Sequence, residues 1–327
     1  MLLADPDHPA PALRVATVEF ELRAEQEAVF PRYAGATLRG AIGGALRERA
    51  CITGAPTCEG CPQYAVCAYG RLWESPPEPP ADLPKRFADA PRPWVLDPVQ
   101  YGNRTRYLPG DRLAFRVHVF GPGLDFVPWL IQAVATAGTR GLGRGRATFR
   151  LVRASSVDRQ GEAMLLYAND TLSASTPIGV RTLTPARSRA LPEAGRVTLH
   201  LETPLQLVSN GRTAEHVDPQ AFTARLLDRF DRMHLSFEDR PSGLDHQHLR
   251  RVAGLARVVH ADLVPERFER YSQRASRRVP MEGLLGRVTF DHVVPDLYGL
   301  WRLAETLHVG KQATFGFGKV RAQAQED

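Results

Sequence analysis

The sequence predicts an α+β fold in which one unit occurs twice in tandem, because a basic glycine-rich loop is repeated. The segment Gly141–Arg146 (GLGRGR) aligns with Gly316–Arg321 (GFGKVR), and each copy lies between an apolar helical segment and a short strand segment. Upstream, Trp129 and Gly138 align with Trp301 and Gly310 without a gap. Self-similarity at this distance indicates an internal duplication. Because each half alternates strand, helix, strands, helix and strand, we expect two ferredoxin-like (RRM-like, split βαβ) domains.

Length and composition set the expected class of protein. The 327 residues suit two domains, which we place at 1–190 and 195–327. The net charge is +6, arginine greatly outnumbers lysine, and such a balance suits a polyanionic partner. The first residues lack a basic segment followed by an apolar one, and no run of eighteen apolar residues occurs. We therefore expect a soluble, cytoplasmic protein without a membrane partner.

In the first half, the segment Leu13–Arg23 alternates apolar and polar residues and predicts a strand. Ala36–Ala50 predicts a helix in which Arg39, Gly43 and Arg47 share one face. Gly43 and Gly44 lower helix propensity by roughly 1 kcal/mol each, so we expect a close neighbour there, either a packed element or a phosphate backbone. Prolines predict no regular structure over 75–98. Three further elements are expected: the strand Arg112–Phe120, the helix Phe126–Ala137 and the strand Ala147–Arg153.

The segment Ser155–Ala194 predicts one or two strands and the connection between domains, after which the second half repeats the alternation of elements. Helices are expected at Pro219–His234, His246–His260 and Asp296–Leu307. Extended segments are expected at Arg196–Val208, Phe268–Val279, Leu284–Phe290 and Lys319–Ala324. Phe268–Val279 is very basic, and the glycine-rich loop spans 308–321 near the C-terminus.

All four cysteines of the chain, Cys51, Cys58, Cys61 and Cys67, lie within one loop at 51–67. In a reducing compartment, such clustering predicts a closed structural metal site rather than a disulfide framework. Either zinc or a 4Fe–4S cluster is held by four cysteines. The loop resembles the iron–sulfur loop of endonuclease-III-like DNA glycosylases in spacing, although no helix-hairpin-helix context surrounds it. The spacing leaves the choice of metal open.

A wider resemblance rests on four segments: Tyr33–Ala41 with the cysteine loop after it, Thr203–Arg212, Tyr271–Gly286 and the terminal glycine-rich loop. Together they resemble a CRISPR-associated endoribonuclease of the RAMP superfamily, of the kind that processes precursor CRISPR RNA. The resemblance implies two ferredoxin-like domains, CRISPR repeat RNA as partner, and metal-independent cleavage that leaves a 2′,3′-cyclic phosphate. It also implies a catalytic tyrosine before the first helix, where Tyr33 lies, and a catalytic histidine on that helix. The segment Ala36–Ala50 contains no histidine.

Cleavage needs a group that takes the 2′-hydroxyl proton, a group that protonates the leaving oxygen, and cations near the phosphate. We expect His308 to act as proton shuttle, with Tyr33 assisting and Arg39 steadying the phosphate; His246 and His248 are alternatives to His308. RNA contacts are expected from the basic strand and the glycine-rich loop. These residues are Arg274, Arg277, Arg278, Gly310, Lys311, Thr314, Gly316, Gly318 and Lys319.

One alternative function stays open at this stage. A non-catalytic RNA-binding subunit of a CRISPR effector complex would share the fold, and the missing helix histidine favours it. Other effector subunits would then be partners of the chain. A metal-dependent repair enzyme, suggested by the cysteine loop, lacks a carboxylate cluster and a glycosylase context in this sequence.

Overall fold

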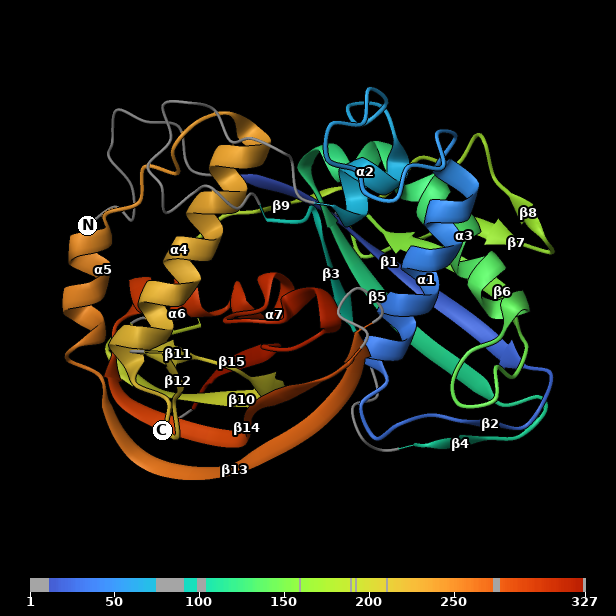
Figure 1. Cartoon of the computed structure of the whole chain (residues 1–327). Coiled ribbons are helices and arrows are strands. Elements are labelled where there is room, and N and C mark those ends of the chain that lie inside the picture. The colour runs from blue at the N-terminus through green and yellow to red at the C-terminus, as the bar shows by residue number, and fades with distance from the viewer. Residues whose placement is uncertain are drawn as a thin grey trace. The chain divides into compact units, whose positions relative to one another are not determined.

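The computed structural model describes residues 12–74, 91–98, 104–158, 160–188, 190–191, 193–209, 211–272 and 277–325. The chain forms two compact units. The N-terminal unit contains Leu13–Thr182, and the C-terminal unit contains Leu183–Leu235 and Asp239–Asp327. The sequence placed the division at 190–195, a few residues later. Figure 1 labels the elements of both units.

The N-terminal unit is a seven-stranded sheet around the central strand β1, with the order β3-β5-β1-β6-β7-β8 and β9 also paired to β1. Its strands are β1 (Leu13–Ala24), β3 (Trp94–Asp97), β5 (Arg112–Phe120), β6 (Phe149–Val157), β7 (Ala163–Ala168), β8 (Thr171–Leu172) and β9 (Arg181–Leu183). A separate pair joins β2 (Ala28–Val29) to β4 (Arg106–Tyr107). The alternation read from the sequence holds in β1, where Val18, Phe20 and Leu22 are buried between more exposed neighbours.

Two helices, α1 (Gly35–Ala50) and α3 (Val127–Arg140), pack against each other in this unit (Figure 1). Leu38, Ile42 and Leu46 of α1 enter the same buried core as Phe20 and Leu22 of β1. A short 3₁₀ turn (Gly121–Phe126) precedes α3, and the helix α2 (Ala68–Trp73) follows the cysteine loop. The loop is thereby held between two helices, α1 before it and α2 after it.

The C-terminal unit is a four-stranded antiparallel sheet with the order β13-β14-β10-β15. Its strands are β10 (Gly195–Leu205), β13 (Arg257–Ser272), β14 (Arg277–Val293) and β15 (Val320–Ala324), and a small hairpin joins β11 (Val208–Ser209) to β12 (Arg212–Thr213). The helices are α4 (Pro219–Glu238), α5 (His246–Ala253), α6 (Pro295–Trp301) and α7 (Ala304–Leu307), with a 3₁₀ turn at Ala313–Phe315. Figure 1 shows α4 and α6 on one side of this sheet.

One face of the C-terminal sheet is apolar and covered, and the other is polar. Val197, Leu199 and Leu201 of β10 are buried, and Phe290 of β14 meets the Trp301 ring of α6 at 5.3 Å between ring centroids. Side chains alternate along a strand, so the residues between these belong to the opposite face.

The structure corrects three details predicted from the sequence. Trp94–Asp97 forms the buried edge strand β3, inside a segment for which prolines predicted no regular structure; residues 75–90 lie outside the described residues. The helix expected over His246–His260 ends at Ala253, and β13 begins at Arg257. The extended segment Phe268–Val279 belongs to two strands of one hairpin, β13 and β14. Nowhere in the described ranges is a helix long and apolar enough to cross a membrane.

Candidate nucleic-acid interface

The glycine-rich loop begins at His308, where α7 ends with a positive φ of 56°. This backbone geometry places the imidazole inside the unit: His308 has 0% exposure, and its Nδ1 lies 2.9 Å from the carbonyl oxygen of Phe317. The guanidinium of Arg229, on α4, donates to the carbonyl of Leu307 at 2.6 Å and so caps the same helix end. Burial lowers the pKa of Arg229 to about 10.

The expectation of an RNA-facing proton shuttle at His308 is therefore wrong in its placement. A fully buried ring offers no surface to a phosphate. The contact of its Nδ1 with the Phe317 carbonyl instead links the start of the loop to its end. The two alternative histidines pair with carboxylates of the same unit: His246 with Asp231 at 2.5 Å, and His248 with Asp296 at 3.7 Å.

The glycines of the loop allow the chain to approach its own backbone. Gly310, Gly316 and Gly318 have φ values of 82°, 92° and 76°, a region that other residues rarely adopt. A Cβ at Gly310 would lie 2.3 Å from the carbonyl oxygen of Gln206, and one at Gly318 would lie 1.9 Å from that of Val309. Gly316 and Gly318 are buried, so the expected approach of a phosphate to these two residues conflicts with the space that the chain itself fills.

The cations of the loop differ in accessibility. Lys311 is exposed, while its backbone N–H donates to the carbonyl of Gln206 at 3.0 Å. Lys319 has a largely buried side chain, and its Nζ lies 3.2 Å from a Glu202 carboxylate oxygen. Arg321 donates to the same carboxylate at 2.8 Å. Thr314 is partly exposed. Of the predicted contacts in this loop, Lys311 is the best exposed cation.

The hairpin of β13 and β14 contacts the glycine-rich loop. The guanidinium of Arg270, on β13, lies 4.7 Å from the Phe315 ring centroid, and the Phe268 and Phe317 rings are 6.1 Å apart. Burial lowers the pKa of Arg270. Arg277 and Arg278 begin β14 and are exposed; Arg278 pairs with Glu269 at 3.1 Å. Arg274 lies outside the described residues.

Tyr33 and Arg39 belong to the N-terminal unit. Tyr33 is buried, with 4% exposure. The Arg39 guanidinium lies 5.9 Å from the ring centroids of both Trp73 and Trp94, which stack on each other at 4.2 Å. Cation–π contact with two indoles occupies the group that was expected to steady a phosphate. The roles proposed for Tyr33 and Arg39 in cleavage stay predictions.

The close neighbour expected at the glycine pair of α1 is Trp73 of α2. A Cβ at Gly43 would lie 2.1 Å from the indole nitrogen of Trp73, whereas one at Gly44 would meet nothing within 4 Å. The neighbour is therefore a packed side chain, and the alternative of a phosphate backbone at Gly43 is wrong. The same helix face holds the cysteine loop, because Arg47 donates to the carbonyls of Ala55, at 2.5 Å, and Pro56, at 3.0 Å.

The four cysteine residues line one small cavity, together with Thr53 and Tyr64. The Thr53 hydroxyl lies 3.7 Å from the Cys51 sulfur and 3.8 Å from the Cys61 sulfur. Hydrogen bonding to Thr53 lowers the pKa of Cys51, and burial raises the pKa of Cys58. The cysteines are not paired as disulfides. Within the described parts of the chain, no three His, Cys, Asp or Glu side chains are arranged closely enough to hold a metal ion.

The sequence identified the first glycine-rich loop, Gly141–Arg146, but the arginines of that loop were not among the residues expected to contact RNA. Arg144 and Arg146 of the first glycine-rich loop are exposed, and neither has an ion-pair partner among residues that the structure describes. Gly141 and Gly143 have positive φ, and the N–H of Arg144 donates to the carbonyl of Val29 at 2.7 Å. The backbone is fixed while both guanidinium groups reach solvent.

Family models match both units. An N-terminal domain family described as AF_1859_N matches residues 13–178, half of the chain, and the chain belongs to it. The model of the CRISPR-associated endoribonuclease Cas6 matches residues 199–320, which include β14, most of β10 and the C-terminal glycine-rich loop up to Val320. The C-terminal unit is of the Cas6 type over these residues. The earlier resemblance to CRISPR RNA-processing endoribonucleases is thereby confirmed.

Solved structures share the fold along the whole chain. The product complex of Cas6 (TTHB231) has a TM-score of 0.55 at 19% identity, covering 94% of this chain and 99% of that one. Thermus thermophilus Cas6 (TTHB231) gives 0.54 at 17% identity, covering 95% and 99%. A partial Cas6-RT-Cas1–Cas2 complex gives 0.57 at 13% identity, covering 96% of this chain and 46% of that one. No curated protein matches the chain in sequence.

Proposed function

We propose that this chain binds CRISPR repeat RNA and cleaves precursor CRISPR RNA into guide RNA. The observation that carries the proposal is the match of the C-terminal unit to the Cas6 endoribonuclease model over residues 199–320. The likeness of the whole chain to Cas6 structures supports it, because both units take part in the shared fold. The net charge of +6 suits an RNA substrate.

The strand orders support the view that both units are ferredoxin-like. In each unit the first strand lies between two later strands. One of these strands precedes the last helical segment of the unit and the other follows that segment, which gives the orders β5-β1-β6 and β14-β10-β15. A fourth strand, β3 or β13, pairs at the outer edge of β5 or β14. This is the order that a split βαβ unit produces.

The chemistry we propose is attack of the 2′-hydroxyl on the adjacent phosphate, which leaves a 2′,3′-cyclic phosphate without a metal ion in the reaction. With no histidine on α1 and with His308 buried, the described residues favour orientation of the RNA and cationic stabilisation over an imidazole shuttle at those positions. We assign His308 a positioning role, since its ring fixes the loop that bears Lys311.

A CRISPR repeat RNA from the same organism, incubated with purified protein in EDTA, tests this function. We expect a single cut, a cyclic phosphate on the upstream fragment, and no cut in a control RNA with one 2′-deoxy group at the site. Tight binding without any cut would instead support the non-catalytic subunit of an effector complex, an alternative favoured by the burial of Tyr33 and His308. Cleavage that EDTA abolishes would remove metal independence from the proposal.

We propose further that the protein works in the cytoplasm and that other CRISPR proteins are among its partners. The names of two similar structures describe assemblies of Cas6 with a reverse transcriptase, Cas1 and Cas2. For this chain, co-purification of tagged protein with CRISPR proteins from its own cells, before and after ribonuclease treatment, tests the partnership. Partners that persist after RNA removal would be bound by protein contacts, and their complete loss would leave RNA as the partner.

We also propose that Cys51, Cys58, Cys61 and Cys67 bind one metal centre, either zinc or a 4Fe–4S cluster. The shared cavity and the Arg47 contacts that hold the loop support this. To bind one metal centre, the four sulfur atoms would have to move closer to one another than they are in this structure. Metal binding would therefore order the loop. A bound centre would have a structural role and would leave RNA cleavage to the rest of the chain.

Anaerobic purification followed by visible absorbance and zinc analysis distinguishes the two metals. Cys61→Ser should lose the metal and lower the melting temperature, whereas Thr57→Val, which changes the lining of the same cavity, should retain the metal. Wild-type protein that contains neither iron nor zinc and unfolds normally would overturn the metal centre.

A further inference from the structure

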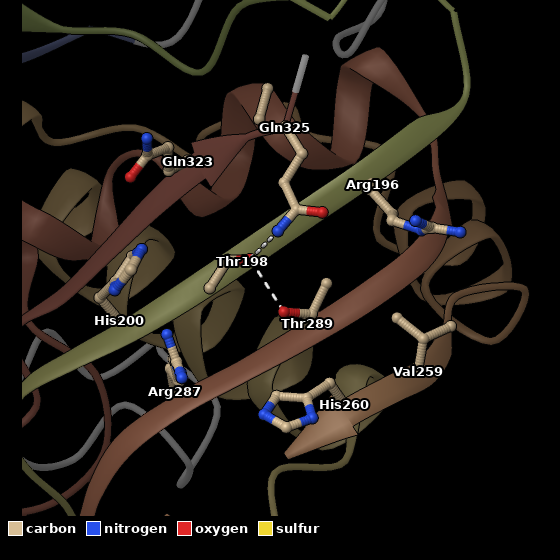
Figure 2. A pocket seen from close by; sticks show the side chains of 10 residues that line it. Arg196, Thr198, His200, Val259, His260, Arg287, Thr289, Gln323 and Gln325 are labelled. Carbon is tan, nitrogen blue, oxygen red and sulfur yellow. Dashed lines mark hydrogen bonds between the residues drawn. The ribbon is translucent and has the colours of Figure 1, made fainter. Parts of the chain in front are cut away.

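The polar face of the C-terminal sheet carries a groove that the catalytic reasoning above does not use. Figure 2 shows its lining residues, which come from all four strands. They are Arg196, Thr198, His200, Val259, His260, Arg287, Thr289, Gln323, Ala324 and Gln325. The groove has a volume of about 1040 Å³. This is at the upper end of the range for small-molecule pockets, and the groove therefore suits a stretch of a chain.

Strand register brings these side chains together. Thr198 of β10 pairs with Thr289 of β14 on one side and with Gln323 of β15 on the other. His200 pairs in the same way with Arg287 and Arg321. The intervening residues of β10, Val197 and Leu199, are fully buried under the helices. Because the register fixes which residues share the face, the cations are held in rows across the sheet.

The floor of the groove is a satisfied hydrogen-bond network. The Thr198 and Thr289 hydroxyls are 2.9 Å apart, and the Gln325 side-chain amide donates to Thr198 at 3.0 Å; Figure 2 draws both bonds. Thr198 and Thr289 are buried, with 5% and 7% exposure. Such a floor is rigid, so it holds the surrounding cations without needing a ligand.

The charge of this face is positive. Arg196 and Arg287 line the groove, and Arg287 has an exposed partner, Asp262, at 3.9 Å. At the neighbouring register position, Glu202 is shared by Lys319 and Arg321, which leaves one positive charge there. A solvent-exposed pair such as Arg287–Asp262 contributes little stability, so Arg287 can exchange its partner for a phosphate.

We propose that this groove binds the phosphodiester backbone of a single-stranded segment of RNA. The proposal rests on the proposed function and names a binding subsite for its substrate. Arg196 and His200 are four residues apart on β10, roughly 13 Å along the strand, which provides room for more than one phosphate. No Phe, Tyr or Trp is among the lining residues, and the two rings present are the smaller imidazoles of His200 and His260, so the groove offers bases little stacking surface. The contacts should therefore be to phosphate and insensitive to sequence.

The test measures binding of labelled oligouridylate and of repeat RNA to the full chain across a salt series. Arg196→Ala combined with Arg287→Ala should weaken binding of both RNAs roughly tenfold at low salt and flatten the salt slope by about 1.4, or about 0.7 for each lost contact. The matched control is Arg302→Ala, an exposed arginine at the end of α6 on the helix-covered side. It should leave the slope unchanged. A double Arg-to-Lys variant should retain most of the slope.

The possible results separate this groove from the proposed function. Variants that bind more weakly but still cut saturating repeat RNA support the groove as a binding subsite. Wild-type cleavage with unchanged affinity and slope in the Arg196/Arg287 variant overturns the groove and leaves the function intact. If wild-type protein fails to cut repeat RNA, the function fails, while the oligouridylate series still decides the groove. Stronger competition by an acidic peptide than by oligouridylate would assign this face to a protein partner and overturn the proposal. Thermal unfolding of each variant checks that the unit is folded.

Discussion

The two glycine-rich loops have similar backbone conformations, but their cationic side chains differ in whether they form ion pairs. Aligned glycines agree closely in φ: 97° at Gly141 against 92° at Gly316, and 75° at Gly143 against 76° at Gly318. In both loops, a Cβ on the second glycine would collide with a carbonyl oxygen, at 2.7 Å for Gly143 and 1.9 Å for Gly318. The pattern of glycines therefore encodes a tight turn after a helix, made twice.

The side chains that follow those glycines separate the two loops. Arg144 and Arg146 are exposed and lack ion-pair partners in the described chain, whereas the aligned Lys319 and Arg321 share Glu202. Glu202 lies on β10, the strand beside β15, and its carboxylate neutralises part of the charge of the C-terminal loop. A glycine-rich basic motif thus predicts the backbone conformation of the loop well. Whether the cations of the motif are available to a phosphate depends on one acidic neighbour.

The largest effect we expect comes from the glycines. Gly318→Ala should destabilise the C-terminal unit by about 3 kcal/mol or more, because the backbone is left-handed and the new Cβ has no space. Gly145→Ala, also at positive φ but with nothing within 4 Å of the added Cβ, should cost only about 1 kcal/mol. Denaturant unfolding measures both. Equal costs would mean that conformation alone, and not packing, requires the glycines.

The next effect concerns His308 and decides between its two roles. His308→Ala should destabilise the protein by about 2 kcal/mol, because a buried ring and its contact with the Phe317 carbonyl are lost. Below the melting temperature, cleavage by the variant should slow without a change in the shape of its pH–rate profile. If the pH–rate profile of the variant lacks one of the two pH-dependent limbs while its stability is unchanged, His308 acts as the proton shuttle that the sequence predicted.

Much of the fold followed from periodicity, and the site did not. The strands at Leu13–Ala24 and Arg112–Phe120 and the helix at Gly35–Ala50 match alternating or helical patterns to within a residue or two. The edge strand Trp94–Asp97 was missed because its four residues are all buried and stand among prolines, so no alternation marks them. His308 was misplaced because adjacency in sequence to Lys311 says nothing about which way a left-handed residue turns its side chain.

RNA affinity should show the difference between the two loops directly. Arg144→Ala with Arg146→Ala should flatten the salt dependence of repeat-RNA binding by about 1.4, because two available cations are lost. Lys319→Ala with Arg321→Ala removes two cations already shared with Glu202 and should change the slope by less. A larger loss from the second pair would show that Glu202 releases its partners to RNA, and it would return the C-terminal loop to the centre of the interface.

The smallest expected effect is a pH dependence at His200, on the same strand as Glu202. Burial, followed by the charge of Arg321, lowers the pKa of His200 below its ordinary value of 6.5. The unfolded chain therefore takes up a proton more readily than the folded chain, and stability should fall as the pH drops below about 7 toward the folded pKa. His200→Gln should flatten that part of the stability–pH curve in urea unfolding. Arg321→Gln should flatten it only partly, since burial is the larger cause. A curve that is unchanged by His200→Gln would mean that the ring is fully hydrated in the folded state, as a loosely packed β15 edge would allow.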